Sequence, residues 1–124
     1  MAATVLVVED DRLIREFISK ILRREAYQVI EADDGAIALE MLRAFRCDLV
    51  ISDFAMPKLN GIKFVEQLHT LQPRMPIILI TGYLSVMSDA TILDGVTDVF
   101  VKPFDPDVLR STVHRLLDTT PQVY

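Results

Sequence analysis

The sequence contains no tryptophan and a single cysteine, Cys47, among its 124 residues. One thiol cannot form an intramolecular disulfide, so a disulfide-stapled secreted scaffold is excluded. Apolar runs are also short, since none approaches the roughly 18 residues of a transmembrane helix. The acidic run at residues 9–11 interrupts any signal-peptide core that would begin at Met1. We therefore expect a cytoplasmic protein that does not associate with the membrane.

Basic residues are outnumbered, because 13 Lys and Arg face 18 Asp and Glu, for a net charge of −5. Affinity for nucleic acid comes largely from neutralising phosphates, so we expect no direct contact with nucleic acid. Disorder is excluded by the 51% of residues that are hydrophobic. A chain of this length predicts a single domain over residues 1–124, with a core at about 4–117 and a loose tail at 118–124.

What the chain does contain is an alternation of strand-like and helix-like segments. The apolar segments that predict strands are Thr4–Val8, Gln28–Ala32, Asp48–Ser52, Pro76–Thr81 and Asp98–Val101. Helical spacing predicts helices from Leu13 to Leu22, Ala36 to Phe45, Ile62 to Leu71, Ser85 to Leu93 and Asp105 to Leu117. We expect Asp11 and Asn60 as N-caps, and the segment from Ser85 as the least stable helix. Such alternation predicts a doubly wound α/β domain with a parallel sheet and helices on both faces.

Polar residues stand at four of the predicted strand ends. Glu9 and Asp10 follow the first strand, Asp53 follows the third, Thr81 ends the fourth and Lys102 follows the fifth. In doubly wound sheets, ligands bind beyond the carboxyl ends of the strands. We therefore expect these side chains to form one site.

Three carboxylates at one site would repel one another strongly. Two unit charges ~4 Å apart interact by about 4 kcal/mol at an effective dielectric constant near 20. Either one carboxyl group stays protonated or a cation lies among them, and Lys102 alone cannot balance three anions. Hard oxygen ligands without histidine or cysteine favour Mg²⁺.

The segments around these residues resemble the receiver domain of two-component response regulators. The matching motifs are Val5-Leu-Val-Val-Glu9-Asp10-Asp11, Asp48-Leu-Val-Ile-Ser-Asp53-Phe-Ala-Met56-Pro57, Asn60-Gly61, Ile78-Leu-Ile-Thr81-Gly82 and Val101-Lys102-Pro103-Phe104. They occur in the order typical of the family and cover about residues 4 to 117. The resemblance implies a flavodoxin-like fold with a five-stranded parallel sheet in the order 2-1-3-4-5.

The resemblance also implies a role for each acidic residue. Asp53 would be phosphorylated by a phosphohistidine on a histidine kinase or histidine phosphotransfer protein. Asp10 and Asp53 would bind Mg²⁺ directly, Glu9 would help through water, and the Ala55 backbone carbonyl would supply another oxygen. Phosphoryl transfer suits such a site, because it needs a positioned nucleophile and positive charge on the transferring oxygens.

Two further residues would contact the phosphoryl group and link it to an output. By resemblance, Lys102 would pair with the phosphoryl oxygens, Thr81 would hydrogen-bond one of them, and the Lys102–Pro103 peptide would be cis. The output would be a changed surface on the fourth helix, fifth strand and fifth helix. Such a chain is a switch that catalyses only its own phosphorylation and dephosphorylation. The downstream target or fused output domain stays open, and we expect a monomer or weak dimer.

Three positions depart from the family pattern. Val99 stands where the family usually has an aromatic switch residue, and it is either a core filler or a modified switch. Phe100 should face the other side of the sheet, because adjacent strand residues alternate. Ala55 and Tyr83 occupy positions that tune hydrolysis of the phosphoryl group, and Ala55 has no polar side chain to orient water. We therefore predict a long-lived phosphoryl state.

Two alternative functions remain open. The first is a small Mg²⁺-dependent phosphatase with an aspartate nucleophile, but such enzymes usually carry a second acid where Ala55 stands, and a cap insertion. The second is a flavodoxin-like or nucleotide-binding protein, but no glycine-rich phosphate loop follows the first strand.

Overall fold

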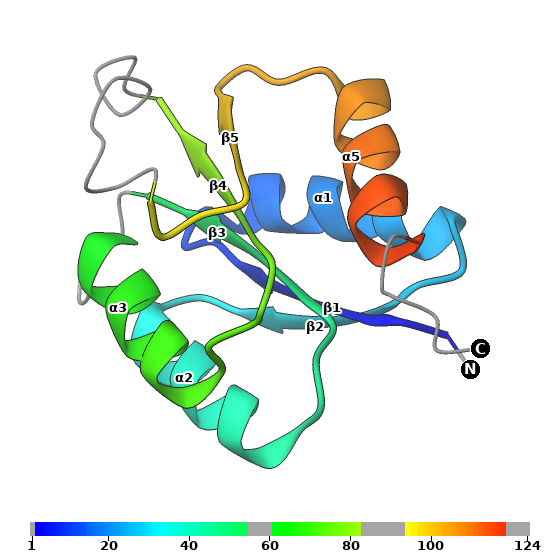
Figure 1. The fold of residues 1–124 in the computed structure, drawn as a ribbon. Helices are drawn as coiled ribbons and strands as arrows, with labels where there is room; N and C mark the ends of the chain where they lie inside the picture. The colour runs from blue at the N-terminus through cyan, green and yellow to red at the C-terminus, as the bar shows by residue number, and fades with distance from the viewer. Residues whose placement is uncertain (1, 55–60, 83–93, 119–124) are drawn as a thin grey trace.

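The computed structural model describes residues 2–54, 61–82 and 94–118. The elements follow the chain as β1 (Thr4–Val8), α1 (Arg12–Arg24), β2 (Gln28–Ala32), α2 (Gly35–Ala44), β3 (Leu49–Asp53), α3 (Gly61–Leu71), β4 (Ile77–Thr81), β5 (Asp98–Val101) and α5 (Pro106–Asp118). The strands form one parallel sheet in the order β2-β1-β3-β4-β5 (Figure 1). This order confirms the predicted fold class.

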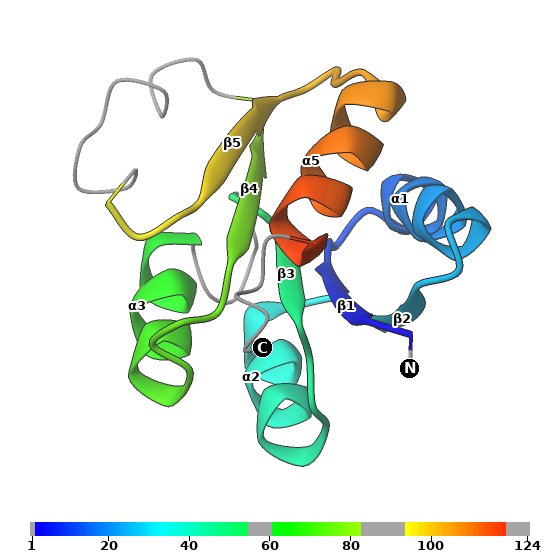
Figure 2. The ribbon, with the colours of Figure 1, turned by 45° about the vertical axis from the view of Figure 1, so that its right-hand side comes forward.

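Helices cover both faces of the sheet. Figure 2 shows α1 and α5 on one face and α2 and α3 on the other. Strand β1 serves both layers, since Val5 and Val7 pack toward α1 and α5 while Leu6 and Val8 pack toward α2 and α3. Burial of each such aliphatic side chain stabilises the fold by about 1.5–3 kcal/mol. The continuous apolar runs of the sequence are therefore explained by strands covered on both sides.

Strand β3 differs from its prediction by one residue, because it runs from Leu49 to Asp53 instead of from Asp48 to Ser52. Asp48 lies just before the strand, where its Oδ2 atom accepts a hydrogen bond of 2.8 Å from the backbone N–H of Thr4. Asp53 is part of the strand, because it pairs with Ile80 of β4, and all five residues of β3 are buried. Strand β4 likewise begins at Ile77, one residue later than predicted.

The helix boundaries follow from capping. Asp11 caps α1 as predicted, accepting hydrogen bonds from the backbone N–H groups of Leu13 and Ile14. Asp34 caps α2 in the same way through the N–H of Ile37, so this helix begins at Gly35, one residue earlier than the apolar pattern indicated. The predicted cap Asn60 and the predicted helix from Ser85 to Leu93 lie outside the described residues.

Helix α5 ends at Asp118, a residue that we assigned to the tail. Its apolar pattern ends at Leu117, and the helix continues one residue further because backbone hydrogen bonds do not require an apolar side chain. Within residues 2–54, 61–82 and 94–118, no helix combines the length and the apolar character that crossing a membrane requires.

Candidate functional site

An acidic cluster lies at the carboxyl edge of the sheet. Carboxylate oxygens of Glu9, Asp10 and Asp53 all lie within 4.8 Å of one another. The register explains the approach, because Val8, the last residue of β1, pairs with Ser52 of β3, and each of the two is followed in the chain by an acidic residue. Glu9 is 2% exposed and Asp53 6% exposed, whereas Asp10 is exposed to solvent. The cluster therefore has two buried members and one that opens to solvent.

Lys102 contacts both buried carboxylates. Its Nζ atom lies 3.1 Å from Oε1 of Glu9 and 3.2 Å from Oδ1 of Asp53. The backbone N–H of Lys102 donates a hydrogen bond of 2.7 Å to the carbonyl of Thr81, and the Lys102–Pro103 peptide is cis, as predicted. Residues at the ends of β1, β3 and β4 thus hold the ammonium group among the acidic side chains.

Burial is the main reason that the pKa of Glu9 is raised to about 7, and the hydrogen bond and negative charge of Asp53 add to it. The contact with Lys102 opposes this shift without cancelling it. Burial alone would lower the pKa of Lys102, but its contacts with Glu9 and Asp53 outweigh burial and raise it. Three carboxyl groups thus share the site with one ammonium, a combination that favours a bound proton or cation.

Thr81 is the last residue of β4 and is fully buried. In the sheet, Asp53 pairs with Ile80 and Thr81 pairs with Val101, so Thr81 lies at the same edge as Asp53 and Lys102. The structure therefore brings together Glu9, Asp10, Asp53 and Lys102, with Thr81 at the same edge. Ala55 and Tyr83 lie outside the described residues.

Arg15 contacts this site and was missed by the sequence analysis. Its Nη1 atom donates a hydrogen bond of 2.8 Å to the backbone carbonyl of Glu9, and its Nε atom lies 3.3 Å from Oε1 of Glu31. The sequence carries no signal for this contact, because an arginine on an amphipathic helix ordinarily faces solvent.

Comparison with known proteins identifies the family. The family model of the response regulator receiver domain matches residues 5–114. The chain belongs to this family. It is the receiver domain of a two-component response regulator, a switch controlled by phosphorylation. This assignment agrees with the predicted function and does not favour the phosphatase alternative.

Curated relatives agree with the family assignment. Response regulator MprA of Mycobacterium ulcerans is 36% identical over 121 residues, which are 97% of this chain and 52% of MprA. Response regulator protein FleR of Pseudomonas aeruginosa is 36% identical over 116 residues, which are 93% of this chain and 24% of FleR. The receiver domain described here thus spans about half the length of MprA and less of FleR.

Solved structures share the fold. Response regulator TrrA of Thermotoga maritima, in complex with Mg²⁺-BeF, is 32% identical with a TM-score of 0.86, covering 93% of this chain and 99% of TrrA. Chemotaxis protein CheY4 of Vibrio cholerae is 33% identical with a TM-score of 0.87, covering 94% of this chain and 100% of CheY4.

Val99 and Phe100 face opposite sides of the sheet, as predicted. Val99 is 8% exposed and packs with Leu79, Phe54 and Val96. Phe100 lies on the α1 and α5 face, where its ring centroid is 6.5 Å from that of Phe104. Phe100 therefore does not substitute for the aromatic residue that the family usually has at position 99.

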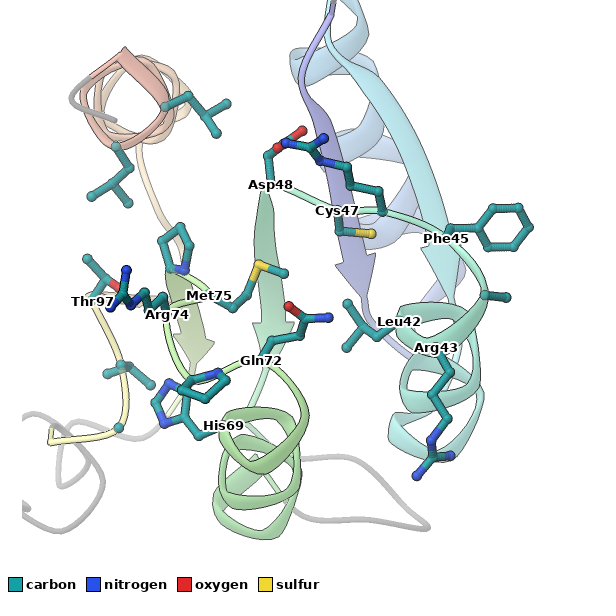
Figure 3. Close-up of a pocket in the computed structure, with 18 of the residues that line it drawn as sticks. Leu42, Arg43, Phe45, Cys47, Asp48, His69, Gln72, Arg74, Met75 and Thr97 are labelled. Carbon is teal, nitrogen blue, oxygen red and sulfur yellow. The ribbon is translucent and has the colours of Figure 1, made fainter. Parts of the chain in front are cut away.

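A cavity of about 1300 Å³ lies at the opposite, amino-terminal edge of the sheet (Figure 3). Arg43 and Arg74 line it, together with Cys47 and Met75. Helices α2 and α3 end beside this cavity, and guanidinium groups at helix C-termini balance the partial negative charge of the last carbonyls. Arg43, in the last turn of α2, therefore has a structural explanation, and the cavity is remote from the acidic cluster.

Proposed function

We propose that Asp53 accepts the phosphoryl group, from a phosphohistidine on a histidine kinase or histidine phosphotransfer protein. The proposal rests on the position of Asp53 at the end of β3, with its Oδ1 atom 3.2 Å from the Lys102 ammonium. A carboxylate oxygen of Asp53 forms a bond to phosphorus while the phosphorus–nitrogen bond breaks, and the electron pair of that bond passes to the imidazole nitrogen. The product is an acyl phosphate on Asp53.

Mg²⁺ fits the donor set of the acidic cluster. Its three carboxylates are hard oxygen ligands that lie within 4.8 Å of one another, and burial, with the neighbouring Asp53 adding to it, raises the pKa of Glu9 to about 7. Asp10 and Asp53 would hold the ion directly, Glu9 through water, and the backbone carbonyl of Ala55 would add an oxygen. When bound, the ion neutralises charge on the transferring phosphoryl group.

Lys102 and Thr81 would stabilise the phosphoryl oxygens. The raised pKa of Lys102 keeps its ammonium protonated at neutral pH, so it can transfer from the two carboxylates to a phosphoryl oxygen. The Thr81 hydroxyl, at the same edge of the sheet, would donate a hydrogen bond to another. Movement of these residues on phosphorylation would change the surface that includes β5 and α5, which is the proposed output.

An apolar surface beside the site supports a protein partner. Leu13 is 76% exposed and Phe17 48% exposed on α1, and the Phe17 ring centroid lies 6.2 Å from that of Phe104, which follows the cis Lys102–Pro103 peptide. Leu13 and Phe17 lie one helical turn apart on α1, and adjoining exposed apolar side chains, unlike scattered ones, are typical of interaction sites. We assign this surface to docking of the protein that carries the phosphohistidine.

The receiver domain forms a single domain over residues 1–124, acts in the cytoplasm as a monomer or weak dimer, and catalyses only its own phosphorylation and dephosphorylation.

Mass spectrometry after incubation with acetyl phosphate and Mg²⁺ tests the central step. We expect one phosphoryl group per chain, stable in acid and labile in base, and absent after Asp53→Ala. Asp33→Asn is the matched control, because Asp33 is an exposed acid that follows the edge strand β2. An adduct that survives Asp53→Ala contradicts the proposal, and repeated turnover of phosphate monoesters would favour a phosphatase.

A further inference from the structure

The backbone of Glu9 is held on both sides. Its N–H donates a hydrogen bond of 3.0 Å to the carbonyl of Ala32, and its carbonyl accepts one of 2.8 Å from Nη1 of Arg15. A hydrogen bond from a charged donor is about twice as strong as one between neutral groups. The Glu9 carbonyl belongs to the peptide that joins Glu9 to Asp10, so Arg15 fixes the plane from which the Asp10 side chain projects.

Arg15 is itself anchored from the edge strand. Glu31 on β2 pairs in register with Val7, whose side chain faces α1. The Oε1 atom of Glu31 lies 3.3 Å from Nε of Arg15. The Arg15 side chain is 19% exposed and that of Glu31 28%, so both lie partly beneath the surface. The other Glu31 oxygen, Oε2, lies 3.3 Å from Nη2 of Arg23, whose side chain is 53% exposed.

The effect of Arg15 on the backbone of Glu9 can be distinguished from the effect of its charge. Glu31 balances the guanidinium of Arg15, so the pair adds little net charge to the acidic cluster. Arg23 has the same charge and the same partner, which it contacts through Oε2 of Glu31. What distinguishes Arg15 is its hydrogen bond to the Glu9 carbonyl.

We propose that Arg15, anchored by Glu31, is a positioning residue for the divalent-cation site, holding the Glu9–Asp10 peptide in the orientation that lets both carboxylates face the ion. The inference rests on the proposed Mg²⁺ site. Residues that orient metal ligands through hydrogen bonds typically change metal affinity 10- to 100-fold when they are removed. Because Asp10 is the exposed member of the cluster, its orientation depends most on the backbone.

The test combines Mg²⁺ titration with a measurement on the metal-free protein. Arg15→Gln should weaken Mg²⁺ binding roughly 10-fold. The binding is measured from the amide NMR shifts of Asp10 and Asp11 during the titration. In the metal-free protein, the same variant should shift the Asp10 amide resonance and accelerate its hydrogen exchange, while amides of β4 stay unchanged. Arg15→Lys should recover part of the affinity, because a lysine can donate to the carbonyl but cannot also hold Glu31 in the same geometry.

Arg23→Gln is the matched control, because it removes an equal charge from the other oxygen of Glu31. We expect its Mg²⁺ affinity to stay within about twofold of the parent, below the loss typical of residues that orient metal ligands. Glu31→Gln, which removes the anchor but keeps Arg15, should lie between the two arginine variants and serves if Arg15→Gln folds poorly.

The outcomes separate this proposal from the proposed function. If the parent protein binds Mg²⁺ and Arg15→Gln binds it equally well, the positioning role is overturned and the metal site stands. Equal losses in the Arg15 and Arg23 variants would overturn it too, because the effect would then be one of charge. If the parent protein binds no Mg²⁺, the metal site fails and the role of Arg15 fails with it.

Discussion

The Nζ atom of Lys102 lies 3.1 Å from Oε1 of Glu9, although 93 positions separate the two residues in the sequence. Glu9 follows β1 and Lys102 follows β5, on strands that are not neighbours in the sheet. The contact spans the carboxyl edge over β3, whose last residue, Asp53, also contacts the ammonium. The lysine therefore compensates part of the acidic charge before any cation or phosphoryl group binds.

Replacing Lys102 with methionine should slow phosphorylation of Asp53 by acetyl phosphate about 10²-fold or more, because a donor to the charged oxygens of the transition state is lost. Mg²⁺ affinity should stay equal or rise, since a competing cation is removed. Mass spectrometry gives the rate of adduct formation, and Lys20→Met, at an exposed position of α1, is the control. An unchanged rate in Lys102→Met would contradict the role of this lysine.

The stability of the metal-free protein should depend on pH through Glu9. The pKa of Glu9 is about 7 in the folded state, against the ordinary value of 4.5 that applies in the unfolded chain. The folded state therefore binds the proton more tightly. The resulting stabilisation is fully present below about pH 4.5 and is lost as the pH rises through about 7. Urea unfolding in chelator at about pH 5 and about pH 8 should show this loss, and Glu9→Gln should reduce it. If the pH dependence is the same in both proteins, Glu9 is not the titrating group.

Bound Mg²⁺ should offset the loss of stability at high pH, because the ion competes with the proton for the carboxylates. We expect Mg²⁺ affinity to increase between about pH 6 and about pH 8, with a smaller increase in Glu9→Gln. Titration followed by amide NMR shifts measures it. An affinity that is constant over this range would show that the ion does not displace a proton from the cluster.

Val99→Ala should destabilise the receiver domain by about 1–2 kcal/mol, because Val99 is buried against Leu79 of the neighbouring strand β4. The rate of phosphorylation should not change. Urea unfolding and the acetyl phosphate assay give the two quantities. Val108→Ala, at a position on α5 that is 51% exposed, is the control for stability. A large change in phosphorylation rate would favour the alternative reading of Val99 as a modified switch.

Ala55→Asn should shorten the lifetime of the phosphoryl group severalfold, because an amide side chain two residues past Asp53 can orient an attacking water. Decay of the adduct after removal of acetyl phosphate measures the lifetime. Ala44→Asn, at the exposed end of α2, provides the control. Equal decay in the two variants would refute the predicted influence of position 55.

The five strands and the meeting of Glu9, Asp53 and Lys102 were predictable, because apolar runs mark strands buried on both faces and parallel strands bring their carboxyl ends to one edge. The order of the strands followed only from the resemblance to receiver domains, which the sheet confirms. The N-cap Asp11 was predictable from its residue type and place before a helical pattern. The boundary of β3 was not, because a strand ends where its backbone pairing with neighbouring strands ends, and Asp48 bonds Thr4 of β1 through both its backbone N–H and its side chain.

The sequence by itself determined which residues can carry charge at the edge of the sheet, since residue type and strand position are local properties. Only the tertiary structure decided that Glu9 is buried with a raised pKa, and that Arg15 bonds the Glu9 carbonyl instead of facing solvent. Both depend on which groups from distant segments surround a side chain. Burial and hydrogen bonding are set by those neighbours, and no spacing along the chain encodes them.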